Sequence, residues 1–512
     1  MKKKFFMMAL ASAMMLNSVS AISFAEEAEK HLEVSTFWIT PSLDFSDSYT
    51  GWVCTRIGVG ETLVKLDDSV QLEGWLADSW ENTDELTWNI HIRDGITFHN
   101  GKAVDAAAAM ASIQYALDNN NRADTYLNID SMSADGQNLT IKTREPNAAL
   151  IFNLTEPLFC IFDVTCEDMV NCPQGTGPYK VAGFESDVRV DLAKNENYWD
   201  GEVGLDTITV SEIPDSEARV MALQSGETEM TVTLDNASLK LFENDDYNVS
   251  VVIGERTNVT YMNHERPFTS DKTLRQAISW AVDRDTYAEN ITGGEPATGL
   301  FPSSLPYHND TLNAYTYDVD KANQILDDAG YVDTDGDGIR EMNGENIHLE
   351  YYMATAHGSS DTMLLAQAIQ ADLKKIGVDV ELQMTENLSD VLTSGEFDMS
   401  SDNSNTAPTG DPEYFLSVRY SSAQGGGGDH GSNTGRYSSE GMDEIIKKLA
   451  GTFDTEERYN LAHDAAQLLL DDAAALYLTY VPMNTVSASY VVGAEQPTVD
   501  YYMITKDLTI NK

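Results

Sequence analysis

The fold is decided by three neighbouring segments: Leu-Ala-Asp-Ser-Trp at 76–80, Leu-Thr-Trp at 86–88 and Ile-Arg-Asp-Gly-Ile-Thr-Phe-His-Asn-Gly at 92–101. Apolar and polar residues alternate from Thr87 to Ile92, which predicts a strand with one buried face. Asp94-Gly95 is a turn signal, and we expect it to join two strand-like runs. This region therefore predicts strands joined by a tight turn.

Helical patterns occur on both sides of these segments. Val104 to Leu117 is predicted to be a helix with Asp105 near its start, and Leu139 to Lys142 a short strand after the turn signal at 135–136. Further predicted helices cover 274–282, 361–376 and 456–470, and a further strand covers 378–382. We find no internal repeat and no long linker, and glycine repeats only at 425–428. The pattern predicts a mixed α/β protein whose domains pack closely.

The N-terminus has the layout of a secretory signal peptide. Lys2, Lys3 and Lys4 precede an apolar run from Phe5 to Leu16, and Ser23-Phe24-Ala25 supplies small residues for cleavage. We expect the mature chain to begin near Glu26, although a cut after Ala21 would also fit. Since no cysteine lies near either site, we expect no lipid anchor and a protein free in the periplasm.

Size and charge limit the classes of function. A mature chain of about 490 residues is too long for one core, so two or three domains are expected. The chain has 83 acidic residues against 32 basic ones, a net charge of -51. Such a surface repels nucleic acids and anionic membranes.

Four cysteines are present, at positions 54, 160, 166 and 172. Export makes disulfides chemically feasible, and four cysteines allow three complete pairings. The last three lie close together in sequence, so we expect one local bridge among them. Their spacing does not match a zinc site.

More motifs follow in a fixed order along the chain. They are Gly-Thr-Gly-Pro-Tyr at 175–179, Asn-Glu-Asn-Tyr-Trp at 195–199, Arg219 to Leu223 with Gly226, the helix at 275–284, Gly-Asp-Pro at 410–412, and Tyr-Ser-Ser at 437–439 with Met442-Asp443. We expect these residues to be structural, with Gly175 and Gly177 adopting backbone angles closed to other residues. Together with the opening segments, they resemble the family 5 extracellular solute-binding proteins, which bind dipeptides, oligopeptides and nickel.

The resemblance implies a class II periplasmic-binding-protein clamp of the three-domain type. Two lobes would close by hinge motion around a small ligand and deliver it to an ABC permease heterodimer with ATPase subunits. We expect a monomer. The expected divisions are 1–25 signal peptide, 26–71 and 173–265 lobe 1, 72–172 an extra domain of lobe 1, 266–483 lobe 2, and 484–512 a return to lobe 1.

The resemblance also suggests ligand-contacting residues. Cys54 and Tyr126 fall where the nickel-binding branch has a methionine and a tryptophan, and Glu156 falls where it has an arginine that neutralises a chelate. A glutamate at this place would favour an amine or a cation, because a partly buried carboxylate without a partner is costly. The alternative for Glu156 is a solvated loop carboxylate. We therefore expect a cationic or amine-bearing ligand, such as a short peptide or a metal chelate of little net negative charge.

The late motifs supply further candidates. The peptide-binding branch has an amino-binding aspartate shortly before Asp-Pro, where this chain has Pro408, so Glu156 or Asp402 would have to replace it. His430 follows the glycine-rich stretch in a loop comparable to one that holds a metal-binding histidine, although a lone histidine in a loop is more often just solvated. Completing the candidate set are Thr406, Tyr414 as an aromatic wall or core residue, and Arg419 and Arg436 as sources of positive charge.

Residues 333–339, Asp-Thr-Asp-Gly-Asp-Gly-Ile, match the first half of a calcium loop, with Asp333, Asp335 and Asp337 as ligands. The twelfth position is Gly344, where a bidentate glutamate is expected. Glu341 or Glu345 could replace it. The simpler interpretation, which we prefer, is an acidic turn after a helix that ends at Gly330.

Two other functions remain open from the sequence. An exported hydrolase is disfavoured because neither a Gly-x-Ser-x-Gly elbow nor a His-Glu-x-x-His helix is present. A solute receptor that does not feed a transporter would keep the same fold. We expect a binding protein that is not an enzyme and needs no cofactor.

Overall fold

The computed structural model describes residues 29–355, 360–427 and 432–511. The predicted signal peptide and His430 lie outside these residues. The described part is the mixed α/β structure that the sequence predicts, and no helix within it is long and apolar enough to cross a membrane.

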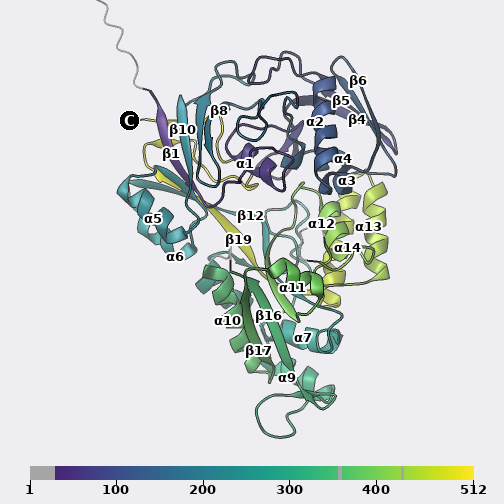
Figure 1. Ribbon diagram of the computed structural model, residues 1–512. Helices are drawn as coiled ribbons and strands as arrows, with labels where there is room; N and C mark the ends of the chain where they lie inside the picture. Colours follow the sequence, from purple (N-terminus) through teal and green to yellow (C-terminus); the bar gives the residue numbers. More distant parts are fainter. Residues whose placement is uncertain (1–28, 356–359, 428–431, 512) are drawn as a thin grey trace, which may run out of the picture.

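One sheet of 11 strands connects the two lobes. Its order is β17-β16-β18-β12-β19-β11-β1-β10-β9-β8, and β13 (Glu295–Pro296) pairs with β19 outside this path. The long strands β12 (Tyr247–Met262) and β19 (Ala475–Ala488) pair antiparallel and run from the upper lobe into the lower one (Figure 1). We call the upper part lobe 1 and the lower part lobe 2.

Lobe 1 holds one half of this sheet. Strand β1 (His31–Thr36) lies between β10 (Thr207–Glu212) and β11 (Met230–Val232) and pairs parallel with both. Strands β9 (Arg189–Lys194) and β8 (Tyr179–Glu185) complete this half. The other elements of lobe 1 include α1 (Thr50–Arg56), α5 (Ser216–Ser225), α6 (Asn236–Leu239) and two separate two-stranded sheets, β2 (Val64–Leu66) with β3 (Leu72–Gly74), and β20 (Val491–Val492) with β21 (Thr509–Ile510). The last two bring the C-terminal segment back to lobe 1.

A four-stranded sheet in the order β4-β5-β7-β6 forms a separate layer of lobe 1. Its strands are β4 (Ala77–Asp84), β5 (Thr87–Ile92), β7 (Asn138–Thr143) and β6 (Ile129–Asp135), and α2 (Ala106–Asn119) packs on it. The predicted strand at 87–92 and the strand around 139–142 are confirmed. The helix predicted from 104 is confirmed as α2, which begins two residues later because Asp105 caps it by accepting a hydrogen bond from the Ala108 N–H.

The turn at Asp94-Gly95 does not lead into a second strand. Gly95 adopts a φ of +84°, but the chain then forms a loop that holds a single bridge, Thr97 to Ala103. Ile96 and Phe98 are buried, and the His99 N–H donates to the Gly175 carbonyl. The loop is therefore held by the burial of Ile96 and Phe98 and by the hydrogen bond from His99 to Gly175, and not by pairing with a neighbouring strand.

Lobe 2 is built on β16 (His348–Ala354), β17 (Asp379–Thr385) and β18 (Met399–Asn405). The predicted helices are confirmed as α7 (Lys272–Ala281), α10 (Ser360–Lys374) and α14 (Thr455–Asp471), and β17 confirms the strand predicted at 378–382. The other elements are α8 (Arg284–Tyr287), α9 (Val319–Asp328), β14 (Glu341–Met342), β15 (Glu345–Asn346), α11 (Leu388–Ser394), α12 (Pro412–Tyr420) and α13 (Glu440–Gly451). Helices α12, α13 and α14 lie beneath α3 (Arg122–Leu127) and α4 (Leu150–Asn153) of lobe 1 (Figure 1).

A buried carboxylate holds two of the sequence motifs in place. Glu61 has no exposed surface and accepts hydrogen bonds from Thr176 Oγ1 at 2.8 Å, Tyr198 OH at 2.6 Å and Trp199 Nε1 at 2.9 Å. The motifs at 175–179 and 195–199 are thus joined to the segment after α1, which confirms that they are structural.

Gly175 and Gly177 are required for space, not for unusual backbone angles. Neither has a positive φ, so that part of the sequence interpretation is wrong. A Cβ on Gly175 would lie 2.1 Å from the Val59 carbonyl oxygen, and one on Gly177 would lie 2.3 Å from that of Gly58. Backbone segments therefore approach each other too closely for any side chain.

The expected local disulfide is not formed. All four cysteines are free thiols: Cys54 and Cys160 are buried, Cys166 is half-buried and Cys172 is exposed. Cys160 lies in the apolar core of lobe 1, whereas Cys172 faces solvent and lies near the Val181 carbonyl. The three neighbouring cysteines therefore occupy different environments despite their closeness in sequence.

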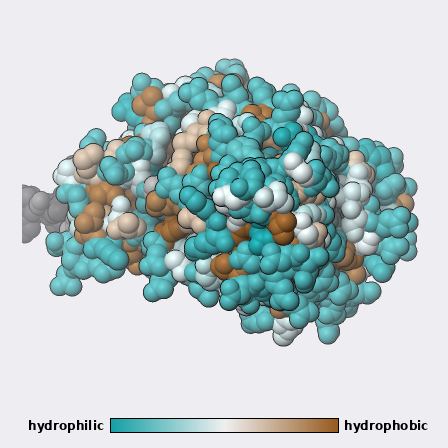
Figure 2. All heavy atoms as spheres, turned by 90° about the horizontal axis from the view of Figure 1, so that it is seen from below, coloured by the Kyte–Doolittle hydropathy of each residue, from teal (hydrophilic) through white to brown (hydrophobic). Residues whose placement is uncertain are grey.

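The face of the molecule seen from below is polar. Seen from below, the molecule is mostly hydrophilic, and hydrophobic residues form small separate groups (Figure 2).

Candidate functional site

The lobes meet at two stacked tyrosines that sequence analysis proposed as ligand contacts. Tyr126 on α3 and Tyr414 on α12 have ring centroids 3.7 Å apart and ring planes 11° apart. A backbone hydrogen bond from the Ala148 N–H to the Ala450 carbonyl joins the lobes close by. We call the side chains around this stack the interlobe cluster; it comprises Tyr49, Trp52, Arg122, Tyr126, Glu156, Tyr414, Arg419 and Tyr501.

Glu156 is a buried member of this cluster and not a solvated loop residue. It has no exposed surface, and its carboxylate accepts hydrogen bonds from Trp52 Nε1 at 2.8 Å and from Tyr501 OH at 3.5 Å. Burial raises the pKa of Glu156 to about 7, although Arg122 and the two donors act in the opposite direction. The expectation that Glu156 lacks a protein partner is wrong, because Trp52 and Tyr501 approach it from distant segments.

Arg122 was not identified from the sequence. Its guanidinium lies 3.8 Å from the centroid of the Tyr49 ring and donates to the Ser48 carbonyl at 2.8 Å. Burial acts to lower the pKa of Arg122, but the neighbouring Tyr126, Glu156, Tyr49 and Tyr414 together raise it. Arg122 precedes Tyr126 by four residues on one helix, so the placement of Tyr126 could have pointed to it.

Lobe 2 contributes Arg419 from α12. Its guanidinium forms an ion pair with Asp402 at 3.4 Å, donates to Thr434 Oγ1 at 2.7 Å, and lies over the Tyr261 ring at 5.5 Å. Burial raises the pKa of Tyr49 on lobe 1, and the charge of Arg419 acts in the opposite direction. Positive and negative groups from both lobes therefore face the same region.

Three other candidates lie elsewhere. The Cys54 thiol is fully buried in lobe 1 and donates to the Leu43 carbonyl. Thr406 donates from both its N–H and Oγ1 to the Glu255 carbonyl, each at 3.0 Å. Arg436 has a φ of +51° and lies beside α11, where it pairs with Glu265 at 3.2 Å and donates to the Leu392 carbonyl. The structure does not bring these residues to the tyrosine stack.

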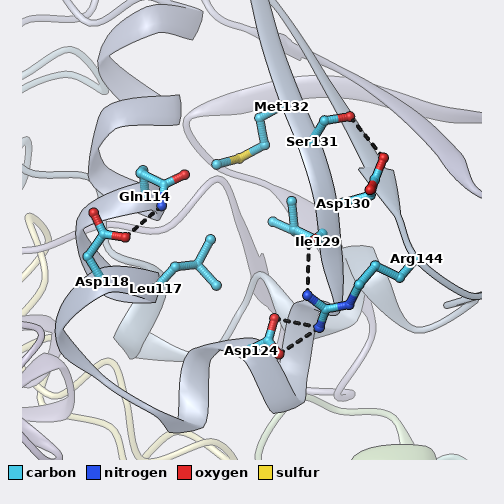
Figure 3. A pocket seen from close by; sticks show the side chains of 9 residues that line it. All are labelled: Gln114, Leu117, Asp118, Asp124, Ile129, Asp130, Ser131, Met132 and Arg144. Carbon is cyan, nitrogen blue, oxygen red and sulfur yellow. Dashed lines mark hydrogen bonds and ion pairs between the residues drawn. The ribbon is translucent and has the colours of Figure 1, made fainter.

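A separate hollow of about 370 Å³ opens on lobe 1 (Figure 3). Its polar side chains bond to one another: Arg144 pairs with Asp124, and Gln114 donates to Asp118. None of its lining residues belongs to the interlobe cluster.

The acidic loop at 333–341 folds around its own backbone. Asp333 accepts from the N–H groups of Gly336 and Gly338, and Asp335 from that of Asp337. Glu341 accepts from Thr334, and carboxylate oxygens of Asp333, Asp335 and Glu341 lie within 4.8 Å of one another. These bonds describe a turn capped by carboxylates, and calcium binding here stays a prediction.

Comparison with known proteins agrees with this architecture. Residues 71–427 match the model of bacterial extracellular solute-binding proteins, family 5 middle. Nickel-binding protein NikA of Staphylococcus aureus is 27% identical over 465 residues, which cover 90% of this chain and 91% of that protein. Its crystal structure with Ni(L-His)2 has a TM-score of 0.81, 26% identity, and coverage of 94% and 100% of the two chains. A nickel ABC transporter structure from Bacillus halodurans is 31% identical, with a TM-score of 0.78 and the same coverage.

Proposed function

Because this chain belongs to the bacterial extracellular solute-binding proteins of family 5, we propose that it captures an amine-bearing or cationic small solute for an ABC importer. The solute is a short peptide, or a nickel or other metal chelate of little net negative charge. Lobe 1 and lobe 2 close on it, and the closed form is delivered to the membrane permease.

The observation that carries this proposal is the meeting of rings and opposite charges from both lobes. Tyr126 and Tyr414 provide apolar faces, which suit the apolar part of a small solute. The charges of Arg122 and Glu156 from lobe 1 and of Arg419 from lobe 2 all act on Tyr49. Charges of both signs favour a solute that itself carries both signs, as an amino acid, a short peptide or an amino-acid chelate does.

A nickel chelate is supported by the relatives. NikA of Staphylococcus aureus is a nickel-binding protein by name, and its crystal structure holds Ni(L-His)2. In such a complex, His430 would offer this chain a neutral imidazole for the metal. A peptide instead would use Glu156 or Asp402 for its amino group.

The cellular location and the partner proteins are part of the same proposal. We propose that the signal peptide is cleaved near Glu26 and that the mature protein is a monomer, free in the periplasm where an outer membrane exists. Its partners are a permease heterodimer and two ATPase subunits. Genes for these four subunits next to the gene for this protein would favour a transport function over that of a receptor without a transporter.

The direct test is mass spectrometry of solute released from the purified protein, with metal analysis of the same sample. We expect a peptide or amino-acid compound, with stoichiometric nickel if it is a chelate. Recovery of an anionic or uncharged solute that lacks an amine would overturn the proposal.

A further inference from the structure

Glu255 and Arg256 lie where the chain crosses between the lobes. The pairing of β12 with β19 shifts register between Ile253 and Thr257, so residues 254–256 are not paired with β19, although Arg256 still pairs with Asn405 of β18. The Glu255 carbonyl accepts two hydrogen bonds from Thr406 of lobe 2. The side chains of this bulge therefore lie between both lobes, where hinge motion would take place.

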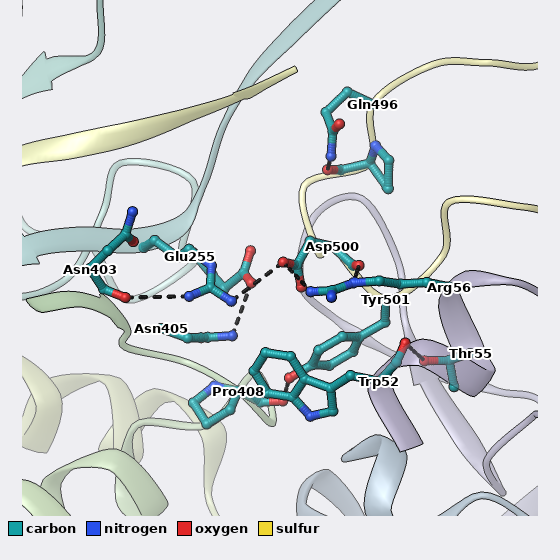
Figure 4. A network of polar contacts seen from close by, with 12 residues as sticks. Trp52, Thr55, Arg56, Glu255, Asn403, Asn405, Pro408, Gln496, Asp500 and Tyr501 are labelled. Atoms are coloured by element: carbon teal, nitrogen blue, oxygen red, sulfur yellow. Dashed lines mark hydrogen bonds and ion pairs between the residues drawn. The ribbon is translucent and has the colours of Figure 1, made fainter. Parts of the chain in front are cut away.

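The C-terminal segment brings an aspartate to this bulge (Figure 4). Arg56 Nη2 lies 2.7 Å from Asp500 Oδ2, and Arg256 Nη2 lies 3.3 Å from the same oxygen. The Nε of Arg56 also donates to the Asp500 carbonyl at 2.9 Å, and Arg256 Nη1 to that of Asn403 at 3.3 Å. Both guanidiniums thus share one carboxylate oxygen and fix its orientation.

Each carboxylate keeps one oxygen without a partner among the described residues. Asn405 Nδ2 donates to Glu255 Oε1 at 3.0 Å, but Glu255 Oε2 and Asp500 Oδ1 are buried and accept nothing. Glu255 has no exposed surface, and Figure 4 shows the two carboxyl groups turned toward each other. Buried acceptors normally have a donor, so an unpartnered oxygen on each of two neighbouring carboxyl groups indicates a missing group with N–H or O–H bonds.

The charge of that group follows from the surroundings. Burial and the negative charge of Asp500 raise the pKa of Glu255 to about 8, in spite of Arg256 and Arg56. The environment of Glu255 therefore favours a proton on the carboxyl group or, once that proton has left at higher pH, another positive charge. An ammonium group supplies both the charge and three donors, enough to reach both oxygens.

We propose that Glu255 and Asp500 form an acceptor pair for a protonated primary amine of the solute. The proposal rests on the proposed function, since the amine belongs to the captured molecule. Trp52 connects this pair to the interlobe cluster: its ring lies 5.5 Å from the Arg56 guanidinium and 5.7 Å from that of Arg256, and its Nε1 donates to Glu156. Glu255 and Asp500 each keep an oxygen without a donor among the described residues, whereas Glu156 accepts from Trp52 and Tyr501.

Methylammonium is the probe, because it is the smallest primary ammonium with a carbon substituent. Tetramethylammonium at the same concentration is the matched control, because it has the charge but no N–H donor. Melting temperature and calorimetric affinity are measured near pH 8.5, with about 50 mM of either chloride, for wild type, Glu255→Gln, Asp500→Asn, Glu156→Gln and the exposed control Glu243→Gln.

We expect methylammonium alone to stabilise the wild-type protein and Glu243→Gln, with affinity about tenfold weaker in Glu255→Gln and in Asp500→Asn. Circular dichroism of each variant without amine shows whether it is folded, and either folded variant suffices. A wild-type protein that does not distinguish the two cations, or a Glu255→Gln variant with unchanged affinity, would overturn the proposal. A loss confined to Glu156→Gln would move the amine site to Glu156. Failure of the proposed function is separate, because it is decided by the chemistry of the released solute.

Discussion

Glu156 links the protonation of one residue to the stability of the whole chain. Burial raises its pKa from 4.5 to about 7, so the native state binds a proton more tightly than the unfolded chain does. Stability contributed by this group is therefore present at low pH and is lost as the pH rises from about 4.5 to about 7. Above pH 7 Glu156 is charged in the folded protein, and the full free-energy cost of burying this charge is present.

Glu156→Gln removes this dependence. We expect the variant to gain stability relative to the wild-type protein as the pH rises from 4.5 to 7, by at most about 3 kcal/mol. Urea unfolding of both proteins across this range measures the difference. A constant difference between them would show that Glu156 keeps an ordinary pKa in the folded protein.

Tyr414 tests the aromatic part of the interlobe cluster. Tyr414→Ala removes the ring that stacks on Tyr126, and we expect it to weaken binding of the released solute at least about tenfold. Tyr414→Phe keeps the ring and serves as the matched control, with an affinity within about threefold of wild type. Calorimetry that finds the two variants alike would exclude a ring contact with the solute.

At the scale of elements, the cap of α2 is a local feature that the sequence predicts. The Asp105 carboxylate accepts from the Ala108 N–H at 2.8 Å. We expect Asp105→Ala to lower the free energy of unfolding by about 1 kcal/mol, because this amide loses its acceptor. Glu85→Ala, at an exposed loop position, is the control and should change stability by less than about 0.5 kcal/mol. Equal losses in both variants would contradict the capping role.

Glu61 holds together segments that lie far apart in the chain. We expect Glu61→Ala to destabilise lobe 1 by about 3 kcal/mol or more, because Thr176, Tyr198 and Trp199 lose a common buried acceptor. Chemical denaturation monitored by tryptophan fluorescence measures this. A loss below about 1 kcal/mol would mean that the motifs are held mainly by other contacts.

These elements also show what a sequence can and cannot predict. Helices and strands follow from local periodicity and caps, so α2, α10 and β5 were found within about two residues. Contacts across long sequence distances carry no local signal. The hydrogen-bond donors to Glu156 are Trp52 and Tyr501, which are distant from it in sequence. The carboxyl groups of Glu255 and Asp500, each with one unpartnered oxygen, come together only because β12 packs against the C-terminal segment. Tyr126, Tyr414, Glu156 and Arg419 of the interlobe cluster were named from the resemblance, whereas Tyr49, Trp52, Arg122 and Tyr501 were not.

On the scale of the whole molecule, β12 and β19 are the strands of the main sheet that pass between the lobes in the described chain. The lobes touch through the tyrosine stack on one side and are joined through the charged bulge at 254–256. Opening would separate the stack while the two strands bend. A solute that contacts both lobes then stabilises the closed form by mass action.

Small-angle X-ray scattering tests this account most directly. The protein is stripped of solute by unfolding and refolding, and scattering is recorded before and after saturation with the solute identified by mass spectrometry. We predict a smaller radius of gyration in the saturated protein, because the lobes close around the solute. An unchanged radius of gyration at proven saturation would contradict capture by closure between the lobes.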